Sequence, residues 1–218
     1  GAVAKLLRGR GLPVHVVGRN QAALAELSSA TGCTHSVCDV TQDNAVGAAV
    51  KEALHRFDGQ LGGLVYAVGS IPIKSAKQAT AAEMLDSFRV NTVGAFEAAK
   101  HSYAALSAAD GGGSIVFYST IAARRGFTNH SLISAAKGGV EGLTVALAAE
   151  YSPKVRVNCI APSLMHTPLA GRMVANPKMA QSLAAMHPLG RLGQPDDGAE
   201  LTAFLLGDGA SWMSGQVL

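Results

Sequence analysis

The sequence predicts an α/β fold, a single domain built on a doubly wound parallel sheet. Two observations support this prediction. Short, continuously apolar runs alternate with longer amphipathic segments, and most of these runs end at a glycine or a polar residue. Strands of a parallel sheet are covered by helices on both faces, so they are apolar throughout. The 218 residues, of which 48% are hydrophobic, are enough to bury one large core.

Three strands are expected in the first third of the chain, at residues 14–17, 35–38 and 64–68. The first two end at Gly18 and Asp39, and a segment with apolar residues on one helical face follows each of them. Residues 1–7 also have the pattern of a helix.

The second half continues the alternation. A long helix is expected from Thr80 to Leu106, because Thr80 and Glu83 have the spacing of a capping box. Strands are expected at residues 114–118 and 155–160, and helices at about 130–150 and 195–206. The stretch from Ser163 to Gln194 contains prolines and few strand formers, so it predicts a mobile lid of short helices.

Composition excludes several classes of partner and site. The net charge of +3 comes from 18 basic and 15 acidic residues that are scattered along the chain. No basic stripe is present, so neither nucleic acid nor a membrane surface is an expected partner. Cys33, Cys38 and Cys159 lack metal-ligand spacing, so no metal is expected. They are predicted to be small core residues in a reducing compartment, the cytoplasm.

The residues that follow the strands indicate a nucleotide site. In a doubly wound sheet the ligand lies beyond the carboxyl ends of the strands. Arg19 follows the first strand, where a fold that prefers NAD usually carries an acid, and a guanidinium suits a ribose 2′-phosphate. NADP(H) is therefore expected rather than NAD(H), with a plain surface arginine as the alternative. Asp39 is a candidate for the adenine amino group or for a helix cap, and Gly69 for close approach of a ribose or for a turn.

The glycine-rich phosphate loop of such folds is not found in the sequence. Residues 1–7 look like the helix that should follow this loop, and the strand before the loop would be the central one of the sheet. We therefore expect both upstream of Gly1, where a targeting peptide is also left open.

Motifs in order along nearly the whole chain resemble the short-chain dehydrogenase/reductase family, which has a Rossmann fold. Those that carry the resemblance are Gly18-Arg19-Asn20, Cys38-Asp39-Val40-Thr41, Val90-Asn91-Thr92-Val93-Gly94, Gly113-Ser114-Ile115-Val116, Ser134-Ala135-Ala136-Lys137-Gly138-Gly139-Val140, Val155-Arg156-Val157-Asn158-Cys159-Ile160-Ala161-Pro162 and Thr167-Pro168. The resemblance implies hydride transfer between NADP(H) and a small carbonyl or alcohol. It also places Val40 and Thr167 at the cofactor.

The family's catalytic residues are carried over onto four positions. The resemblance makes Lys137 the lysine that holds the ribose, Asn91 the asparagine of a water relay, and Thr120, in place of serine, the hydroxyl that polarises the carbonyl. The family's tyrosine should stand one helical turn before Lys137, where this chain has Ile133, whose alkyl side chain has no proton to give.

Other departures from the family are smaller. Tyr66-Ala67-Val68-Gly69 replaces Asn-Asn-Ala-Gly, and Ser163 replaces the glycine after Ala161-Pro162. His130, two helical turns before Lys137, is a candidate for the missing acid, with a loop or cap histidine as the alternative.

Three functions remain open at this point. The first is an NADPH-dependent reductase of a carbonyl compound, and the second is a catalytically silent NADP(H)-binding sensor or scaffold. The third is a lyase or isomerase that reuses the fold. The reductase is favoured because Thr120, Asn91 and Lys137 persist together. The resemblance also implies a homodimer or homotetramer formed through the two long helices around Asn91 and Lys137.

Overall fold

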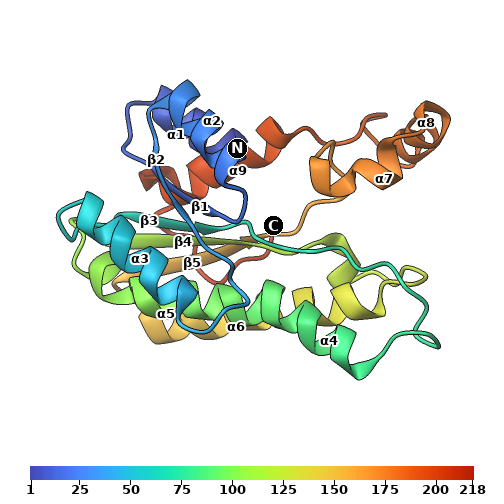
Figure 1. The fold of residues 1–218 in the computed structure, drawn as a ribbon, viewed down its shortest axis with the longest axis horizontal. Coiled ribbons are helices and arrows are strands. Elements are labelled where there is room, and N and C mark those ends of the chain that lie inside the picture. Colours follow the sequence, from blue (N-terminus) through green and yellow to red (C-terminus); the bar gives the residue numbers. More distant parts are fainter.

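The computed structural model describes residues 1–218, except for the side chains of residues 172 and 173. Five parallel strands form two sheets (Figure 1). One sheet pairs β1 (His15–Gly18) with β2 (Thr34–Val37), and the other has the order β3 (Gly63–Tyr66), β4 (Gly113–Tyr118), β5 (Val155–Ile160). The predicted α/β fold and single domain are confirmed.

Helices cover both faces of the strands, as a doubly wound fold requires (Figure 1). The helices on one face are α1 (Ala2–Gly9), α2 (Gln21–Thr31) and α9 (Pro195–Leu206). Those on the other are α3 (Ala45–Arg56), α4 (Ala81–Phe88), α5 (Gly94–Ser107) and α6 (Ser131–Tyr151). Each predicted strand is present, and so is each predicted helix except the continuous one from Thr80 to Leu106; the bounds differ from the prediction by at most a few residues.

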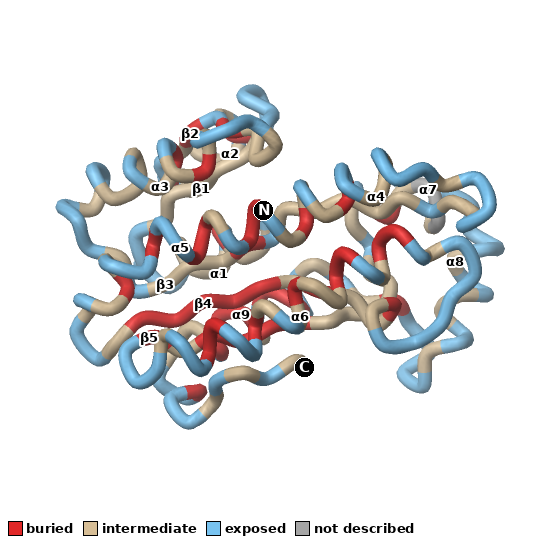
Figure 2. Tube along the Cα trace, turned by 90° about the horizontal axis from the view of Figure 1, so that it is seen from below, coloured by how far each residue is buried: buried red, intermediate tan, exposed pale blue. Residues whose placement is uncertain are grey.

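The core lies around β4, β5 and α6 (Figure 2). Ile115, Phe117 and Val157 are fully buried there. Helix α6 is long and apolar enough to span a membrane by length and composition. It packs along β5, however, and buries one side from Leu132 to Ala148, which identifies it as a core helix. The cysteines are free and buried, as predicted.

The predicted helix from Thr80 to Leu106 is interrupted. Its start is confirmed, since Thr80 and Glu83 form a complete capping box, but residues Arg89–Val93 form a π-helical turn between α4 and α5. In an α-helix the Val90 carbonyl would accept the N–H of Gly94. Here that N–H bonds to the Arg89 carbonyl instead, and the Tyr66 hydroxyl donates to the Val90 carbonyl at 2.6 Å.

The lid consists of short helices, as predicted. They are a 3₁₀ turn (Pro168–Ala170), α7 (Gly171–Val174) and α8 (Pro177–Ala185). Its base is closed by a parallel bridge between Met165 and Gly193. The expected mobility of the lid stays a prediction.

The structure predicts that Gly94 and Tyr66 depend on each other. A methyl group at Gly94 would overlap the Tyr66 hydroxyl, so Gly94→Ala should lower the free energy of unfolding by about 1–3 kcal/mol. Tyr66→Phe removes the hydroxyl, and the penalty of Gly94→Ala should be smaller in that background. Urea unfolding of the two single variants and the double variant measures this coupling, and strict additivity would contradict it.

Candidate functional site

The ends of β1 and β2 bring Arg19 and Asp39 to one edge. The strands are in register from His15 to Gly18, and the Cys38 N–H continues the pairing by donating to the Gly18 carbonyl at 2.8 Å. Arg19 and Asp39 therefore follow neighbouring strand ends. The N–H and hydroxyl of Thr41 donate to one oxygen of Asp39, at 3.0 and 2.8 Å. These bonds, with a smaller contribution from the Arg19 charge, lower the pKa of Asp39.

The turn that follows β3 lies against two polar side chains. Gly69 in this turn is close to both Asn91 and Lys137. A methyl group at Gly69 would lie 2.9 Å from Asn91 Oδ1 and 3.3 Å from Lys137 Nζ. Glycine is therefore the residue that leaves room for both polar side chains. This spacing brings an ammonium group and an amide oxygen close to the backbone at Gly69.

Asn91 is fully buried in the π-helical turn, and its bonds fix its direction. Its Nδ2 donates to the Ser87 carbonyl at 2.9 Å and to Ser70 Oγ at 3.1 Å. Its Oδ1 accepts the Ser70 N–H at 3.3 Å. Asn91 thus ties the helix pair α4 and α5 to the loop that follows Gly69.

Lys137 projects from α6 toward the end of β4. Its ammonium group is buried and donates to the Tyr118 carbonyl at 2.7 Å. Burial lowers the pKa of Lys137 to about 8. The cause is desolvation, which disfavours the charged form of a buried amine.

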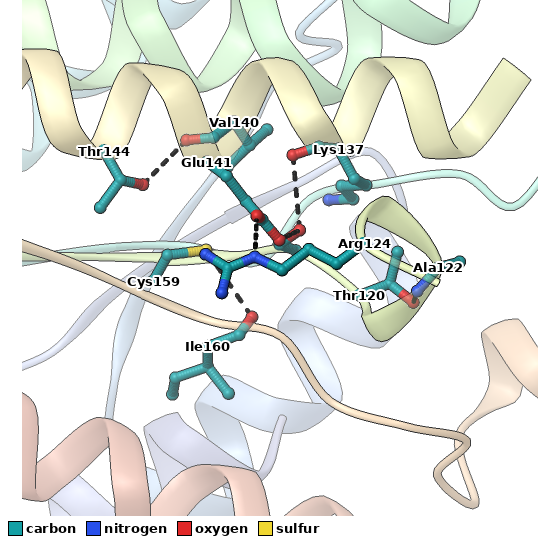
Figure 3. A network of polar contacts seen from close by, with 10 residues as sticks. Thr120, Ala122, Arg124, Lys137, Val140, Glu141, Thr144, Cys159 and Ile160 are labelled. Atoms are coloured by element: carbon teal, nitrogen blue, oxygen red, sulfur yellow. Dashed lines mark hydrogen bonds and ion pairs between the residues drawn. The ribbon is translucent and has the colours of Figure 1, made fainter. Parts of the chain in front are cut away.

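Thr120 stands two residues after Tyr118, whose carbonyl accepts the bond from Lys137. Its Oγ1 accepts the Ala122 N–H at 3.2 Å, which leaves the hydroxyl proton for another partner. The neighbouring Ser119 is buried and donates to Glu141 at 2.8 Å, and Arg124 binds the other Glu141 oxygen at 2.6 Å (Figure 3). Of the two adjacent hydroxyls, Ser119 donates to Glu141, whereas the Thr120 oxygen accepts the Ala122 N–H.

His130 lies apart from this group. It precedes α6, and its Nδ1 contacts the Thr128 carbonyl at 2.7 Å. Together with Phe127 and Ser134 it lines a surface cavity of about 460 Å³. Two helical turns, about 10 Å along the axis, separate it from Lys137. Within the described part of the chain no hydrogen bond joins His130 to Thr120, Asn91 or Lys137. Ile133, one turn before Lys137, is buried.

The remaining predicted cofactor residues are Val40 and Thr167. Val40 is half-buried and packs against the core beside Asp39. Thr167 begins the lid, where its side chain caps the 3₁₀ turn by accepting the Ala170 N–H at 3.3 Å.

A hydroxyl and imidazole pair escaped the prediction from sequence. Ser163 Oγ lies 2.7 Å from His187 Nε2, and His187 Nδ1 lies 2.8 Å from the Leu183 carbonyl. The serine stands just after β5 and the histidine just after α8. Ser163 was visible in the sequence as a departure from glycine, but His187 belongs to no motif.

Comparison with known proteins identifies the family. A family model described as enoyl-(acyl carrier protein) reductase matches residues 1–218. The chain is 31% identical over its whole length to a tropinone reductase homolog of Arabidopsis thaliana, of which it covers 84%. The chain belongs to the short-chain dehydrogenase/reductase family.

Two further relatives of this short-chain dehydrogenase/reductase are enzymes by name. The chain is 34% identical over its whole length to cis-4-hydroxycyclohexanecarboxylate dehydrogenase of Sinomonas cyclohexanicum, of which it covers 88%. The crystal structure of levodione reductase matches all of the chain with a TM-score of 0.92 at 28% identity, and 89% of that structure is covered. The predicted family and its oxidoreductase type are confirmed.

Burial of Lys137 predicts a distinctive pH dependence of stability. Because its pKa falls from 10.5 to about 8 on folding, the unfolded chain binds more protons between these two values. The stability of the wild type relative to Lys137→Met should therefore rise from pH 8 to 10.5, by up to about 3 kcal/mol. Urea unfolding at several pH values measures the difference.

The control is Lys51→Met, at an exposed lysine of α3. Its stability should run parallel to that of the wild type over the same pH range. A constant difference between the wild type and Lys137→Met would contradict the burial of a charged ammonium.

Proposed function

We propose that this protein is an NADP(H)-dependent oxidoreductase that interconverts a small cyclic ketone and its alcohol. The observation that carries the proposal is the meeting of Gly69, Asn91 and Lys137, next to the strand end that presents Thr120. The ring in the substrate is suggested by the cyclohexane alcohol named for one relative. A bound reduced nicotinamide supplies hydride to the carbonyl carbon.

Five other residues would hold the cofactor together with Lys137. Arg19 would bind the ribose 2′-phosphate, since its planar guanidinium matches phosphate oxygens and no acid replaces it after β1. Asp39 and Val40 would contact the adenine, Gly69 would admit a ribose, and Thr167 would contact the nicotinamide end from the lid. Lys137 would donate to the ribose hydroxyls, as its buried cation can.

We further propose that a strand and glycine loop, encoded before Gly1, complete the sheet. In the structure as described, β1 pairs only with β2, and β3 pairs only with β4. No hydrogen bonds between strands join β1 to β3. A parallel strand between them would unite the two sheets. The loop at its end would put backbone N–H groups and the start of α1 at the cofactor's phosphates.

The chemistry differs from the family pattern at one place. We propose that no tyrosine acts here, since the position one turn before Lys137 is the buried Ile133. Thr120 would polarise the substrate carbonyl with its hydroxyl. The proton donor expected from the sequence was His130 or a water molecule. His130 is the weaker choice, because about two helical turns separate it from Lys137.

A silent NADP(H) sensor or scaffold is the second candidate. The observation that favours it is the same Ile133, because an enzyme that lost its acid could keep the cofactor residues for binding alone. Its expected property is tight binding of NADPH without turnover.

We propose that the protein is a cytoplasmic homodimer or homotetramer that assembles through α5 and α6. Phe96 on α5 and Val145 on α6 are exposed apolar residues. The small residues Ala95 and Ala99, by contrast, are buried in the core of the single chain and take no part in this face. The three free, buried cysteines suit a reducing compartment.

Cofactor choice is tested by Arg19→Ala. Loss of a charge-assisted bond to phosphate costs about 1.5–3 kcal/mol, so the affinity for NADPH should fall about 10–100-fold while that for NADH stays the same. Titration by nicotinamide fluorescence measures both. Arg56→Ala, at an exposed arginine on α3, is the control, and equal losses for NADPH and NADH in Arg19→Ala would contradict the 2′-phosphate role.

Turnover is tested on the same sample with cyclohexanone and related cyclic ketones. Oxidation of NADPH that depends on the ketone supports the reductase. Binding of NADPH without oxidation across the ketones favours the sensor or scaffold, and no binding of either nucleotide overturns the cofactor assignment.

The proposed interface through α5 and α6 is tested by placing a charged residue on the exposed face of α6. Val145→Glu should shift the mass in light scattering toward the monomer, because a carboxylate would be buried in an apolar interface. Leu12→Glu, at an exposed leucine beyond α1, should leave the mass unchanged. An unchanged mass of the Val145 variant would place the interface elsewhere.

A further inference from the structure

We propose that the Ser163 and His187 pair supplies the proton that the family takes from its tyrosine. This inference rests on the reductase proposed above, because it assigns the acid for that reaction. Ser163 would be the group that touches the substrate oxygen, and His187 would renew its proton.

The position of Ser163 is set by continued pairing beyond β4 and β5. The Ser119 N–H donates to the Ile160 carbonyl at 2.7 Å, and the Ile121 N–H donates to the Pro162 carbonyl at 3.2 Å. In a parallel pair this pattern sets Ser163 beside Ile121 and Pro162 beside Thr120. Neighbouring strands lie about 4.8 Å apart. Ser163 and Thr120 therefore lie on adjacent segments beyond the carboxyl ends of β4 and β5, the edge at which doubly wound sheets bind their ligands.

The bonds of His187 determine which proton it can give. The Leu183 carbonyl can only accept, so Nδ1 carries a hydrogen. In the neutral ring Nε2 is then bare and accepts the Ser163 hydroxyl at 2.7 Å. In the imidazolium Nε2 also carries a hydrogen and donates to Ser163 Oγ, which turns the serine hydroxyl toward another acceptor. A group that holds the base in one orientation is the usual third member of such pairs.

The step balances with these groups. Ser163 would give its hydroxyl proton to the substrate oxygen, while a bound reduced nicotinamide would supply the hydride for the carbonyl carbon. The Nε2 proton of the His187 imidazolium passes to Ser163 Oγ, which restores the serine. His187 is left neutral and regains a proton from solvent. The reverse sequence serves alcohol oxidation, with neutral His187 as the base.

The pair suits this role better than His130. Both side chains are half-buried, and their hydrogen bond joins the segment after β5 to the residue just after α8. His130 has a backbone carbonyl as its partner and lines an open surface cavity. The competing interpretation of Ser163 and His187 is a latch that holds the lid in place without chemistry.

Two substitutions of His187 distinguish a role in proton transfer from a structural role in holding the lid. His187→Gln keeps an amide that can bond to Ser163 but has no transferable proton, whereas His187→Ala removes both. General acid catalysis is typically worth 10²–10⁴-fold, so kcat for ketone reduction should fall about 100-fold or more in both variants. KM and the dissociation constant for NADPH should change little. Ser163→Ala should lose a similar amount, and His166→Gln, at an exposed lid histidine, should keep the wild-type rate.

Each outcome decides the proposal. A latch would raise KM in His187→Ala and be rescued by His187→Gln, and that pattern overturns the acid role. Unchanged kcat in both His187 variants overturns it while the reductase stands. A wild type that binds NADPH but reduces no ketone overturns the reductase and this role together. If His187→Ala fails to fold by thermal melting, Ser163→Gly, which restores the family residue, and His187→Gln give the same decision.

Discussion

The site depends on one buried cation, the Lys137 ammonium group. It is bonded to the Tyr118 carbonyl at 2.7 Å, and burial lowers its pKa to about 8. Burying an ammonium group is unfavourable unless polar groups surround it, and here a strand end and the glycine turn after β3 converge on it. The fold keeps an unfavourable charge at its ligand edge, and such perturbed groups concentrate at functional sites.

A second constraint fixes the amide beside that cation. The Tyr66 hydroxyl donates to the Val90 carbonyl, which therefore does not accept the N–H of Gly94 as it would in an α-helix. The chain forms a π-helical turn at this point, and Asn91 is fully buried in it. The family pattern has asparagine where this chain has Tyr66. A phenol reaches farther than an amide, and Gly94, without a side chain, leaves space for it. The departure at Tyr66 is therefore accommodated by the packing around the π turn.

The sequence predicted the features that local chemistry determines. Apolar runs predicted the strands, the Thr80 and Glu83 spacing predicted a capping box, and the prolines and few strand formers of residues 163–194 predicted short helices there. It missed the π turn and the Ser163 and His187 pair because each depends on a contact across 24 residues. Sequence spacing predicts contacts between neighbours on one helix or strand. The Tyr66–Val90 and Ser163–His187 contacts each join two different segments of the chain. The position of His130 was predictable, but its contact with the Thr128 carbonyl required the structure.

Gly69, Asn91 and Lys137 lie together in the structure, and Ile133 is buried one helical turn before Lys137. The most direct test of the proposed reductase is a single turnover with cyclohexanone and NADPH that carries deuterium at the transferable position. The account predicts deuterium on the carbinol carbon of the product, as detected by mass spectrometry. Tight binding of the labelled cofactor with all deuterium retained on the nicotinamide would contradict it.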